Sequence, residues 1–186
     1  MALHDLVEGL IHALRYREVR PHLRTCGLMV DLGCGREHRF LKRFHAVAGK
    51  CWGLDISASD SQEGNIVIRR GDITTRLPFE DASVDQATCL AVLEHIRDPL
   101  PILRECRRVL RPGGRLILTT PTRSGIRVHE MMRKLRLVRD VEEGEHQDFA
   151  MSGPKLSEWV RRAGMEVETA RGFEFGMNLL LVARRP

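Results

Sequence analysis

The chain has 186 residues, 42% of them hydrophobic, and this length suits one domain built around one core. Thirty Lys and Arg against 25 Asp and Glu give a formal net charge of +5, and these charges are spread along the sequence. Aromatic residues make up only 5% of the chain, which excludes the interleaved basic and aromatic stripe typical of nucleic-acid binding. We therefore expect no nucleic-acid partner.

The N-terminal region and the cysteines predict a soluble, cytoplasmic protein. Asp5 and Glu8 stand where a secretory signal would be positive, and no apolar run approaches the ~20 residues of a membrane span. The five cysteines are Cys26, Cys34, Cys51, Cys89 and Cys106. They contain no Cys-x-x-Cys pair, so we expect reduced thiols and no metal site.

Residues 3–14 carry apolar side chains at intervals of three and four, which predicts a helix with one apolar stripe. The stripe consists of Leu3, Leu6, Val7, Leu10, Ile11 and Leu14. We expect it to pack on a sheet. A helix lying on a membrane surface is the alternative, which its mixed rather than basic opposite face disfavours.

From residue 28 onward, short apolar runs that end in Gly or Asp alternate with helical stretches, as in a parallel sheet with crossover helices. The predicted strands are residues 28–32, 51–54, 66–69, 84–90, 116–120, 165–169 and 178–183. Seven strands fit one α/β sheet. The last two are close enough in sequence to pair as an antiparallel edge.

Residues 98–114 and 122–152, between the later strands, carry further sequence signals of helix, turn and insertion. Asp98 followed by Pro99 predicts the start of a helix, and residues 111–114 (Arg-Pro-Gly-Gly) predict its end and a turn into the next strand. Residues 122–152 break the alternation with a basic, apolar-striped piece followed by an acidic one. We expect this insertion to form a lid or a substrate-binding element.

A glycine loop and a distant acid form the first functional signal. Gly33 and Gly35 stand where the first strand should end, so the backbone there can approach a ligand closely. Asp55 ends the second predicted strand, 20 residues after Gly35. A carboxylate at about this spacing accepts hydrogen bonds from ribose hydroxyls, which indicates an adenosine-type cofactor.

The charge beside the loop favours one such cofactor over another. Asp31 would place a carboxylate where NAD must lodge a doubly negative pyrophosphate, and the third glycine of the dinucleotide fingerprint is missing from residues 36–38. S-adenosylmethionine has no phosphate, and its ammonium and sulfonium would be attracted by an acid. An NAD-dependent oxidoreductase is therefore disfavoured.

The segment Asp31-Leu32-Gly33-Cys34-Gly35 resembles the first motif of class I S-adenosylmethionine-dependent methyltransferases, and four later segments follow in the family's order. They are Gly53-Leu54-Asp55, Gly71-Asp72-Ile73, Leu93-Glu94-His95 and Leu110-Arg111-Pro112-Gly113-Gly114. The last two resemble signatures of the type 11 branch, which acts on small molecules. The match covers about residues 26–121, and Glu37 departs from the glycine that many members carry there.

The resemblance implies a Rossmann-like, seven-stranded, mostly parallel sheet with helices on both faces and an antiparallel C-terminal strand. It implies S-adenosyl-L-methionine as the cofactor and a small molecule as the methyl acceptor. The implied cofactor-binding residues are Asp31, Gly33, Cys34, Gly35, Asp55, Ile56, Asp72, Ile73, Leu90, Ala91 and His95. Asp55 corresponds to the acid that holds the ribose, and Asp72 to the acid that binds the adenine amine.

His95 and His146 are the candidate catalytic residues. Methyl transfer is an in-line displacement at an activated carbon, so a base is needed only when the acceptor must lose a proton. His95 follows a strand near the expected cofactor cleft, where it could instead order the loop, and His146 lies at the end of the expected lid. The alternative to an enzyme is a sensor or partner-binding module that binds the cofactor without turnover.

Overall fold

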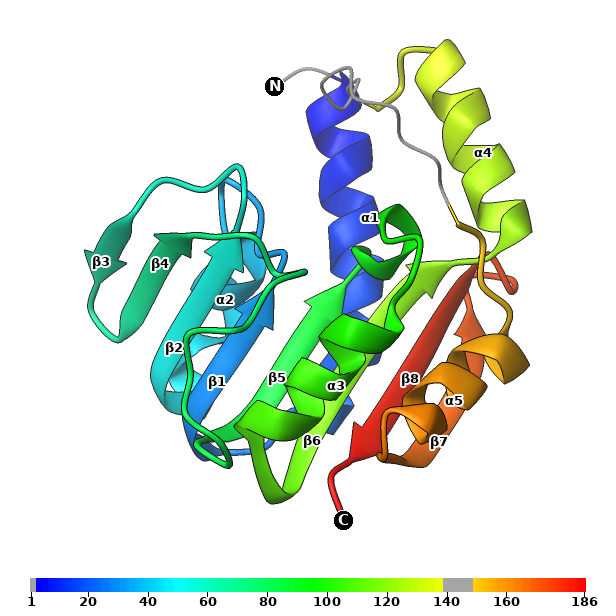
Figure 1. Cartoon of the computed structure of the whole chain (residues 1–186). Coiled ribbons are helices and arrows are strands. Elements are labelled where there is room, and N and C mark those ends of the chain that lie inside the picture. The colour runs from blue at the N-terminus through cyan, green and yellow to red at the C-terminus, as the bar shows by residue number, and fades with distance from the viewer. Residues whose placement is uncertain (1–2, 139–148) are drawn as a thin grey trace.

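The computed structural model describes residues 3–138 and 149–186, and within them it contains one eight-stranded sheet (Figure 1). The strands are β1 (Cys26–Leu32), β2 (Ala48–Asp55), β3 (Ser61–Glu63), β4 (Ile66–Arg70), β5 (Val84–Leu90), β6 (Leu110–Pro121), β7 (Glu166–Phe173) and β8 (Asn178–Arg184). Their order across the sheet is β3-β4-β2-β1-β5-β6-β8-β7.

Neighbouring strands from β4 to β6 run parallel, whereas β8 runs antiparallel to both β6 and β7. The mostly parallel sheet with an antiparallel C-terminal strand is therefore confirmed. The strand that was not expected is β3, which pairs antiparallel with β4 at one edge. Its residues Ser61–Glu63 are polar and exposed, so they carry no apolar period that could have marked a strand.

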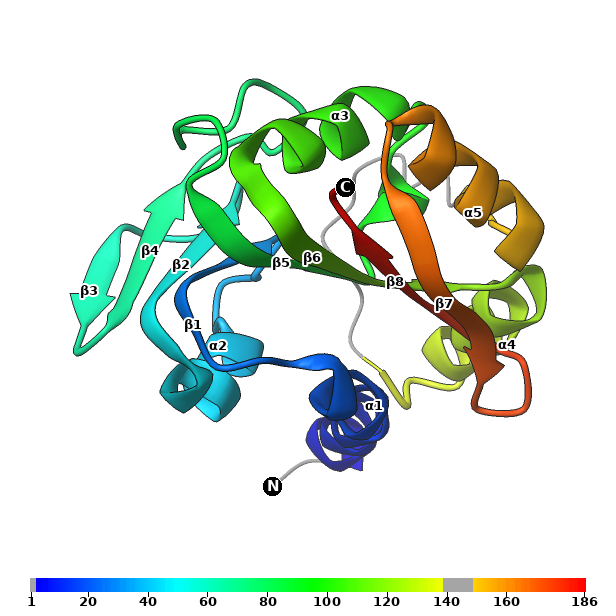
Figure 2. The ribbon, with the colours of Figure 1, turned by 90° about the horizontal axis from the view of Figure 1, so that it is seen from below.

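Helices cover both faces of the sheet (Figure 2). The helices are α1 (Leu3–Val19), α2 (Arg39–Phe44), α3 (Leu100–Val109), α4 (Arg123–Lys134) and α5 (Gly153–Arg162), with short 3₁₀ helices η1 (Arg20–His22), η2 (His45–Val47) and η3 (Leu93–His95). Figure 2 shows α1 and α2 on one face and α3 and α5 on the other, and α4 follows the end of β6.

Two apolar cores result, one on each face of the sheet. In β6, Leu116 and Leu118 belong to the core that contains Leu103 of α3, whereas Ile117 between them belongs to the other core, with Leu41 of α2. All five side chains are fully buried. This alternation follows from the two-residue period of a strand, and it explains the continuous apolar run at residues 116–118 of β6.

The helix α1 forms as predicted, but its apolar stripe does not pack on the sheet. Leu3, Leu6 and Leu10 are 63%, 57% and 59% exposed, and Val19 at the other end is the residue of α1 that is fully buried. Figure 1 shows why: the N-terminal part of α1 extends past the end of the sheet, where no strand lies beneath it. The expectation of a packed stripe is wrong for these three leucines.

The predicted boundaries around α3 are close to those of the structure. The helix begins at Leu100, whose backbone N–H donates to Asp98 Oδ1 at 3.1 Å. Asp98 therefore accepts a hydrogen bond from a backbone N–H at the helix start, as expected. The turn expected at residues 111–114 lies within β6, where the pairing with β5 shifts between Val84 and Gln86. These residues therefore form an irregularity at the start of the strand.

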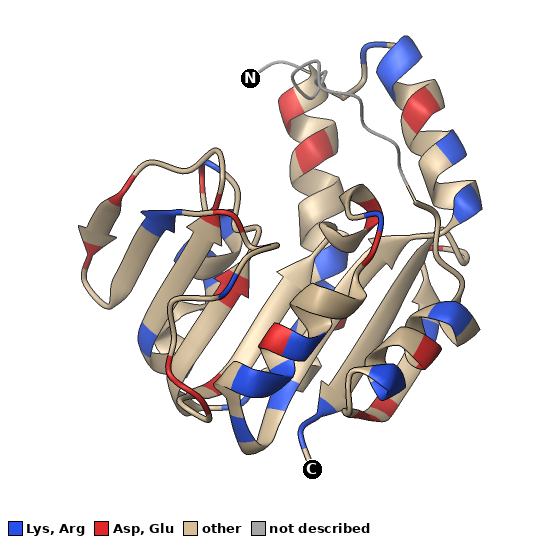
Figure 3. Ribbon diagram, in the orientation of Figure 1, with Lys and Arg blue, Asp and Glu red and all other residues tan. Residues whose placement is uncertain are grey.

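The surface carries mixed charges. Figure 3 shows Lys and Arg interspersed with Asp and Glu on α3, α4 and α5. All five cysteines are free thiols, four of them buried. None of the described helices is both long enough and apolar enough to cross a membrane.

Candidate active site

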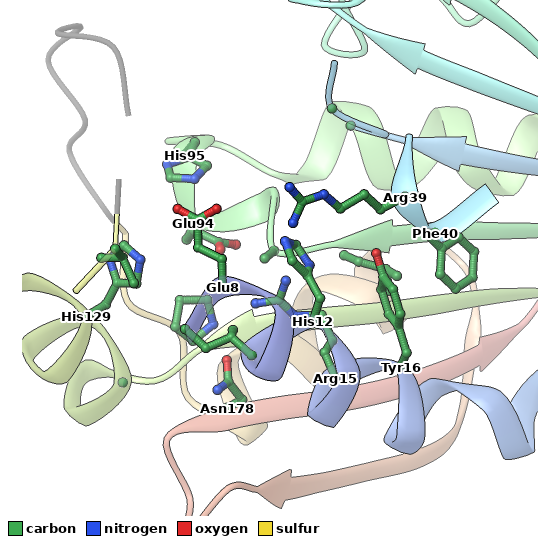
Figure 4. Close-up of a pocket in the computed structure, with 18 of the residues that line it drawn as sticks. Glu8, His12, Arg15, Tyr16, Arg39, Phe40, Glu94, His95, His129 and Asn178 are labelled. Carbon is green, nitrogen blue, oxygen red and sulfur yellow. The ribbon is translucent and has the colours of Figure 1, made fainter. Parts of the chain in front are cut away.

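The parallel strands end at one edge of the sheet, and the strand order reverses between β1 and β5. Ligands of open α/β sheets bind in the crevice outside the carboxyl ends of the strands at such a point. A cavity of about 1270 Å³ opens there. It is walled by α1, the loop after β1, the loop after β5, α4 and the turn between β7 and β8 (Figure 4).

The glycine loop after β1 needs glycine at two positions for different reasons. Gly33 and Gly35 have φ angles of 75° and 70°, in the left-handed region. A Cβ on Gly33 would lie 2.3 Å from Cγ2 of Val92, so the loop after β5 packs directly on it. A Cβ on Gly35 would meet no atom within 4 Å, so the backbone there faces open space that a ligand can enter.

Asp31 is a buried carboxyl group on the wall of this cavity. Its side chain is 2% exposed, and Oδ1 accepts a hydrogen bond of 2.6 Å from Thr88 Oγ1. Burial raises the pKa of Asp31 to about 7, against the opposing effect of the Thr88 hydrogen bond, and the nearby Asp55 adds to the rise. A cation bound beside Asp31 would favour the ionised form of this carboxyl group.

Asp55 connects the ends of β1 and β2. Its Oδ2 accepts from the backbone N–H of Gly35 at 2.8 Å, and its Oδ1 accepts from the backbone N–H and the hydroxyl of Ser57 at 2.8 and 2.6 Å. The backbone carbonyl of Asp55 accepts from the N–H of Gly71 at the end of β4. Asp55 itself is not among the residues that line the cavity.

The remaining predicted residues on this side lie beyond the cavity. Asp72 is exposed, and its Oδ1 accepts from the hydroxyl and the backbone N–H of Thr74, which lowers the pKa of Asp72. Ile73 beside it is buried, whereas Ile56, after the end of β2, is 65% exposed. Asp55, Ile56, Asp72 and Ile73 therefore form a second group at the same edge of the sheet, outside the lining residues.

The other seven predicted cofactor residues all line the cavity. They are Asp31, Gly33, Cys34, Gly35, Leu90, Ala91 and His95. Cys34 is buried, and burial raises the pKa of its thiol. Ala91 has a φ of 57°, a left-handed conformation that is costly for a residue with a Cβ, and its N–H donates to the carbonyl of Thr119 at 2.8 Å.

The candidate catalytic residue His95 lies at the end of η3, on the cavity wall beside Glu94 (Figure 4). Glu94 is 4% exposed and accepts from Thr120 Oγ1 at 3.2 Å through Oε2. The backbone N–H of Phe149 donates to the carbonyl of Glu94 at 2.7 Å. The other candidate, His146, lies outside the described residues.

Five residues of α1 line the cavity, Ile11 and four polar residues, and none of them was expected there. Glu8, His12, Arg15 and Tyr16 recur at helical spacing on one face, opposite the exposed leucines, and Figure 4 shows them turned toward the cavity. His12 Nδ1 and Arg15 Nε are buried and have no hydrogen-bond partner among the described residues. Burial, Arg15 and Arg39 together lower the pKa of His12 to about 4.

The signal for this polar face was present in the sequence. The side chains at positions 8, 12, 15 and 16 fall on one side of a helix, just as the apolar stripe falls on the other. The apolar stripe of residues 3–14 predicts that this side faces the interior, because most helices bury their apolar side. In this protein the polar side of α1 faces the cavity, together with Ile11.

The far wall of the cavity comes from α4 and from the turn between β7 and β8. His129 and Arg133 of α4 line it, as do Glu174 and Asn178 at the turn. His129 and Asn178 are labelled in Figure 4. None of these residues belongs to a motif that the sequence displays.

The site combines a reversed strand order, a glycine loop after β1, a buried acid near the end of β1 and an acid that ends β2. These are the features expected of a class I S-adenosylmethionine-dependent methyltransferase. The methyltransferase domain model of type 11 matches residues 30–118, from the glycine loop to the middle of β6. This match and the methyltransferase relatives described next support a class I methyltransferase of type 11 with S-adenosyl-L-methionine as its cofactor.

Curated relatives include methyltransferases of two kinds. The chain is 30% identical over 156 residues to a probable S-adenosylmethionine-dependent methyltransferase of Mycolicibacterium smegmatis, covering 81% of this chain and 56% of the relative. It is 27% identical over 184 residues to the ubiquinone biosynthesis O-methyltransferase of Pseudomonas aeruginosa, covering 93% of this chain and 77% of the relative.

A third match is shorter. The chain is 38% identical over 102 residues to a 37.1 kDa protein in transposon TN4556 of Streptomyces fradiae, which covers 50% of this chain and only 29% of that protein. Among solved structures, an S-adenosylmethionine-dependent methyltransferase of Mesorhizobium loti has a TM-score of 0.71 at 20% identity, covering 92% of this chain and 98% of the other. This likeness supports the Rossmann-like fold.

Proposed function

We propose that the chain transfers the methyl group of S-adenosylmethionine to a small-molecule acceptor by in-line displacement. The observation that carries this proposal is the buried carboxyl group of Asp31 beside the open backbone of Gly35, on the wall of a cavity of about 1270 Å³. Pockets for one small molecule commonly measure ~300–1,000 Å³, so this cavity has room for part of a cofactor and an acceptor together.

The residues at the sheet edge suit the chemical groups of the cofactor. Asp31 is the acid for the ammonium group, and Arg15, whose buried Nε has no partner among the described residues, is the donor for the methionine carboxylate. Asp55 is the acid for the ribose hydroxyls, since each carboxylate oxygen can accept more than one hydrogen bond. The exposed Ile56 offers an apolar surface for adenine, with Asp72 for its amine.

The bound cofactor supplies a methyl group on a positively charged sulfur, which is a good leaving group. The task of the chain is therefore to position the acceptor and to exclude water. We assign this task to α4 and residues 135–138, as the described part of the expected lid, and to α1 on the opposite wall. His95 is the candidate base for an acceptor that must lose a proton, and its exposed position at the cavity allows it to exchange that proton with solvent.

A small-molecule acceptor is supported by the ubiquinone biosynthesis O-methyltransferase relative and by the volume of the cavity. A location in the cytoplasm and the absence of a nucleic-acid partner stay predictions.

The first test is thermal unfolding of the natural chain with S-adenosylmethionine, S-adenosylhomocysteine or NAD. A ligand at ~100 times its dissociation constant should add about 2.7 kcal/mol of apparent stability. We expect stabilisation by the two sulfur ligands alone and its loss in Asp55→Ala, which also releases Gly35. Glu158→Ala on α5 is the control, because this exposed carboxylate lies far from the site.

Stabilisation by NAD, or by none of the three ligands, would contradict the proposal. Turnover is measured next, as S-adenosylhomocysteine released from S-adenosylmethionine in the presence of a panel of hydroxyl and amine acceptors. Binding of both sulfur ligands without release over the whole panel would favour a sensor or partner-binding module instead of an enzyme.

A further inference from the structure

The turn between β7 and β8 has an unusual backbone. Glu174, Phe175 and Gly176 are three consecutive residues in the left-handed region, with φ angles of 50°, 55° and 78°. Hydrogen bonds from Gly176 N–H to the Phe173 carbonyl and from Met177 N–H to the Glu174 carbonyl close the turn. The conformation suits Gly176 but strains the two residues that carry a Cβ, and such strain is typical of functional sites.

The start of α4 holds this turn in place. The backbone N–H of Thr122 donates to the carbonyl of Met177 at 2.8 Å, and its hydroxyl donates to the carbonyl of Gly176 at 2.9 Å. Gly125 packs so closely that a Cβ there would lie 2.0 Å from the Met177 carbonyl oxygen. The turn is therefore fixed against the helix that walls the cavity.

The strained turn places one carboxylate on the cavity wall. Glu174 Oε2 accepts a hydrogen bond from the side-chain amide of Asn178, and both residues line the cavity. Glu174 Oε1 is buried and has no hydrogen-bond partner in residues 3–138 or 149–186. A buried carboxylate oxygen without a partner is costly, and a hydrogen-bond donor from a ligand would remove this cost.

The surroundings of Glu174 indicate which ligand supplies that donor. The apolar lining residues on this side of the cavity are Ile126, Val128, Met132, Val138 and Met177. His129, Glu130 and Arg133 of α4 also line this side. A carboxylate oxygen without a partner beside these apolar side chains matches a molecule that combines an apolar frame with a hydroxyl or ammonium group. The buried donors Arg15 and His12, which suit an anionic group, belong to α1 and not to this wall.

We propose that Glu174 binds a hydroxyl or ammonium group of the methyl acceptor and thereby determines which acceptors the enzyme takes, with Asn178 positioning its carboxylate. The proposal rests on the proposed function, because it names the class of acceptor for the same cavity. It assigns Glu174 to recognition and leaves proton transfer to other groups.

The test uses three probes built on one benzyl frame: benzyl alcohol, benzylammonium and benzyl methyl ether, which has no donor. Each is titrated by NMR into the protein saturated with S-adenosylhomocysteine. We expect at least one donor probe to bind about tenfold or more tightly than the ether, the range for a hydrogen bond to a charged group. Glu174→Ala should remove this preference.

The variant Glu174→Gln separates the two donor classes, since its amide keeps an acceptor oxygen but loses the charge. A hydroxyl preference should largely survive in Glu174→Gln, whereas an ammonium preference should disappear. Glu158→Gln, with a carboxylate that is 68% exposed on α5, is the matched control and should bind all probes as the natural chain does.

Three results would overturn the inference: equal binding of the three probes, no measurable binding of either donor probe, or a preference that persists in Glu174→Ala. Thermal stabilisation by S-adenosylhomocysteine is measured first on the natural chain and on each variant. If this ligand stabilises none of them, the proposed function fails. If it stabilises all of them equally and the probes are not distinguished, only the role of Glu174 fails.

Discussion

Lowering the pH below neutrality should weaken the binding of S-adenosylhomocysteine, because it protonates Asp31. Burial raises the pKa of this carboxyl group to about 7 from a model-compound value of 3.8. Only the ionised form attracts the ammonium group of the ligand. With a pKa of about 7, roughly 3% of Asp31 is ionised at about pH 5.5, so the dissociation constant there should be about 30-fold higher than on the plateau above about pH 8.

The raised pKa of Asp31 also predicts how the stability of the free protein changes with pH. The folded-state pKa of Asp31 lies above the unfolded value, so folding favours the protonated form. This contribution to stability is fully present below about pH 4 and is lost as the pH rises through about 7. The span of about three pH units corresponds to at most about 4 kcal/mol, so the free energy of unfolding of the free protein should fall by up to this amount.

The assay is isothermal titration calorimetry between about pH 5.5 and 8, in two buffers with different ionisation enthalpies, which reveals the proton released on binding. His12 does not interfere, since its pKa of about 4 keeps it neutral in this range. Asp31→Asn can still accept the Thr88 hydrogen bond but cannot ionise, so its weaker affinity should not change between pH 5.5 and 7. An equal pH dependence in the natural chain and in Asp31→Asn would refute the reasoning.

Two further substitutions test other parts of the site. Arg15→Ala should weaken S-adenosylhomocysteine about tenfold by calorimetry while leaving its decarboxylated analogue unchanged, since the loss is that of a charge-assisted hydrogen bond; an equal loss for both ligands would count against this role. Gly35→Ala should lower the free energy of unfolding in urea by about 1 kcal/mol, because residue 35 has a φ of 70°. An unchanged urea midpoint would show that the loop can adopt another conformation.

The sheet could be predicted from sequence because its strands are buried on both faces. Residues 84–90 form β5 with the predicted bounds, and Val84, Ala87 and Cys89 are the buried apolar residues within it. The strand β3 could not be predicted, since a three-residue polar edge strand has no period to detect. Its position depends on pairing with β4, which is a property of the folded chain.

The cofactor side of the site could be predicted because its residues follow a local spacing in the sequence. The glycine loop and Asp55 are recognisable from local spacing, and the hydrogen bond from Gly35 N–H to Asp55 Oδ2 shows that this spacing brings them together. The acceptor side lacks such a signal. Nothing about a glutamate in sequence indicates a left-handed backbone, so the strained position of Glu174 appears only once β8 and α4 are in place.

The two sides of the cavity are therefore held by different means. On the cofactor side, Asp55 accepts a hydrogen bond from the glycine loop, and the strands beneath it run parallel. This side carries the family's motif. The opposite side consists of α4 and the turn between β7 and β8, joined by contacts such as that of Thr122 with the Met177 carbonyl. Because these segments contribute little to the sheet, their side chains can differ without loss of the cofactor site. If Glu174 recognises the acceptor as proposed, the choice of acceptor depends on a residue that the family motif does not include.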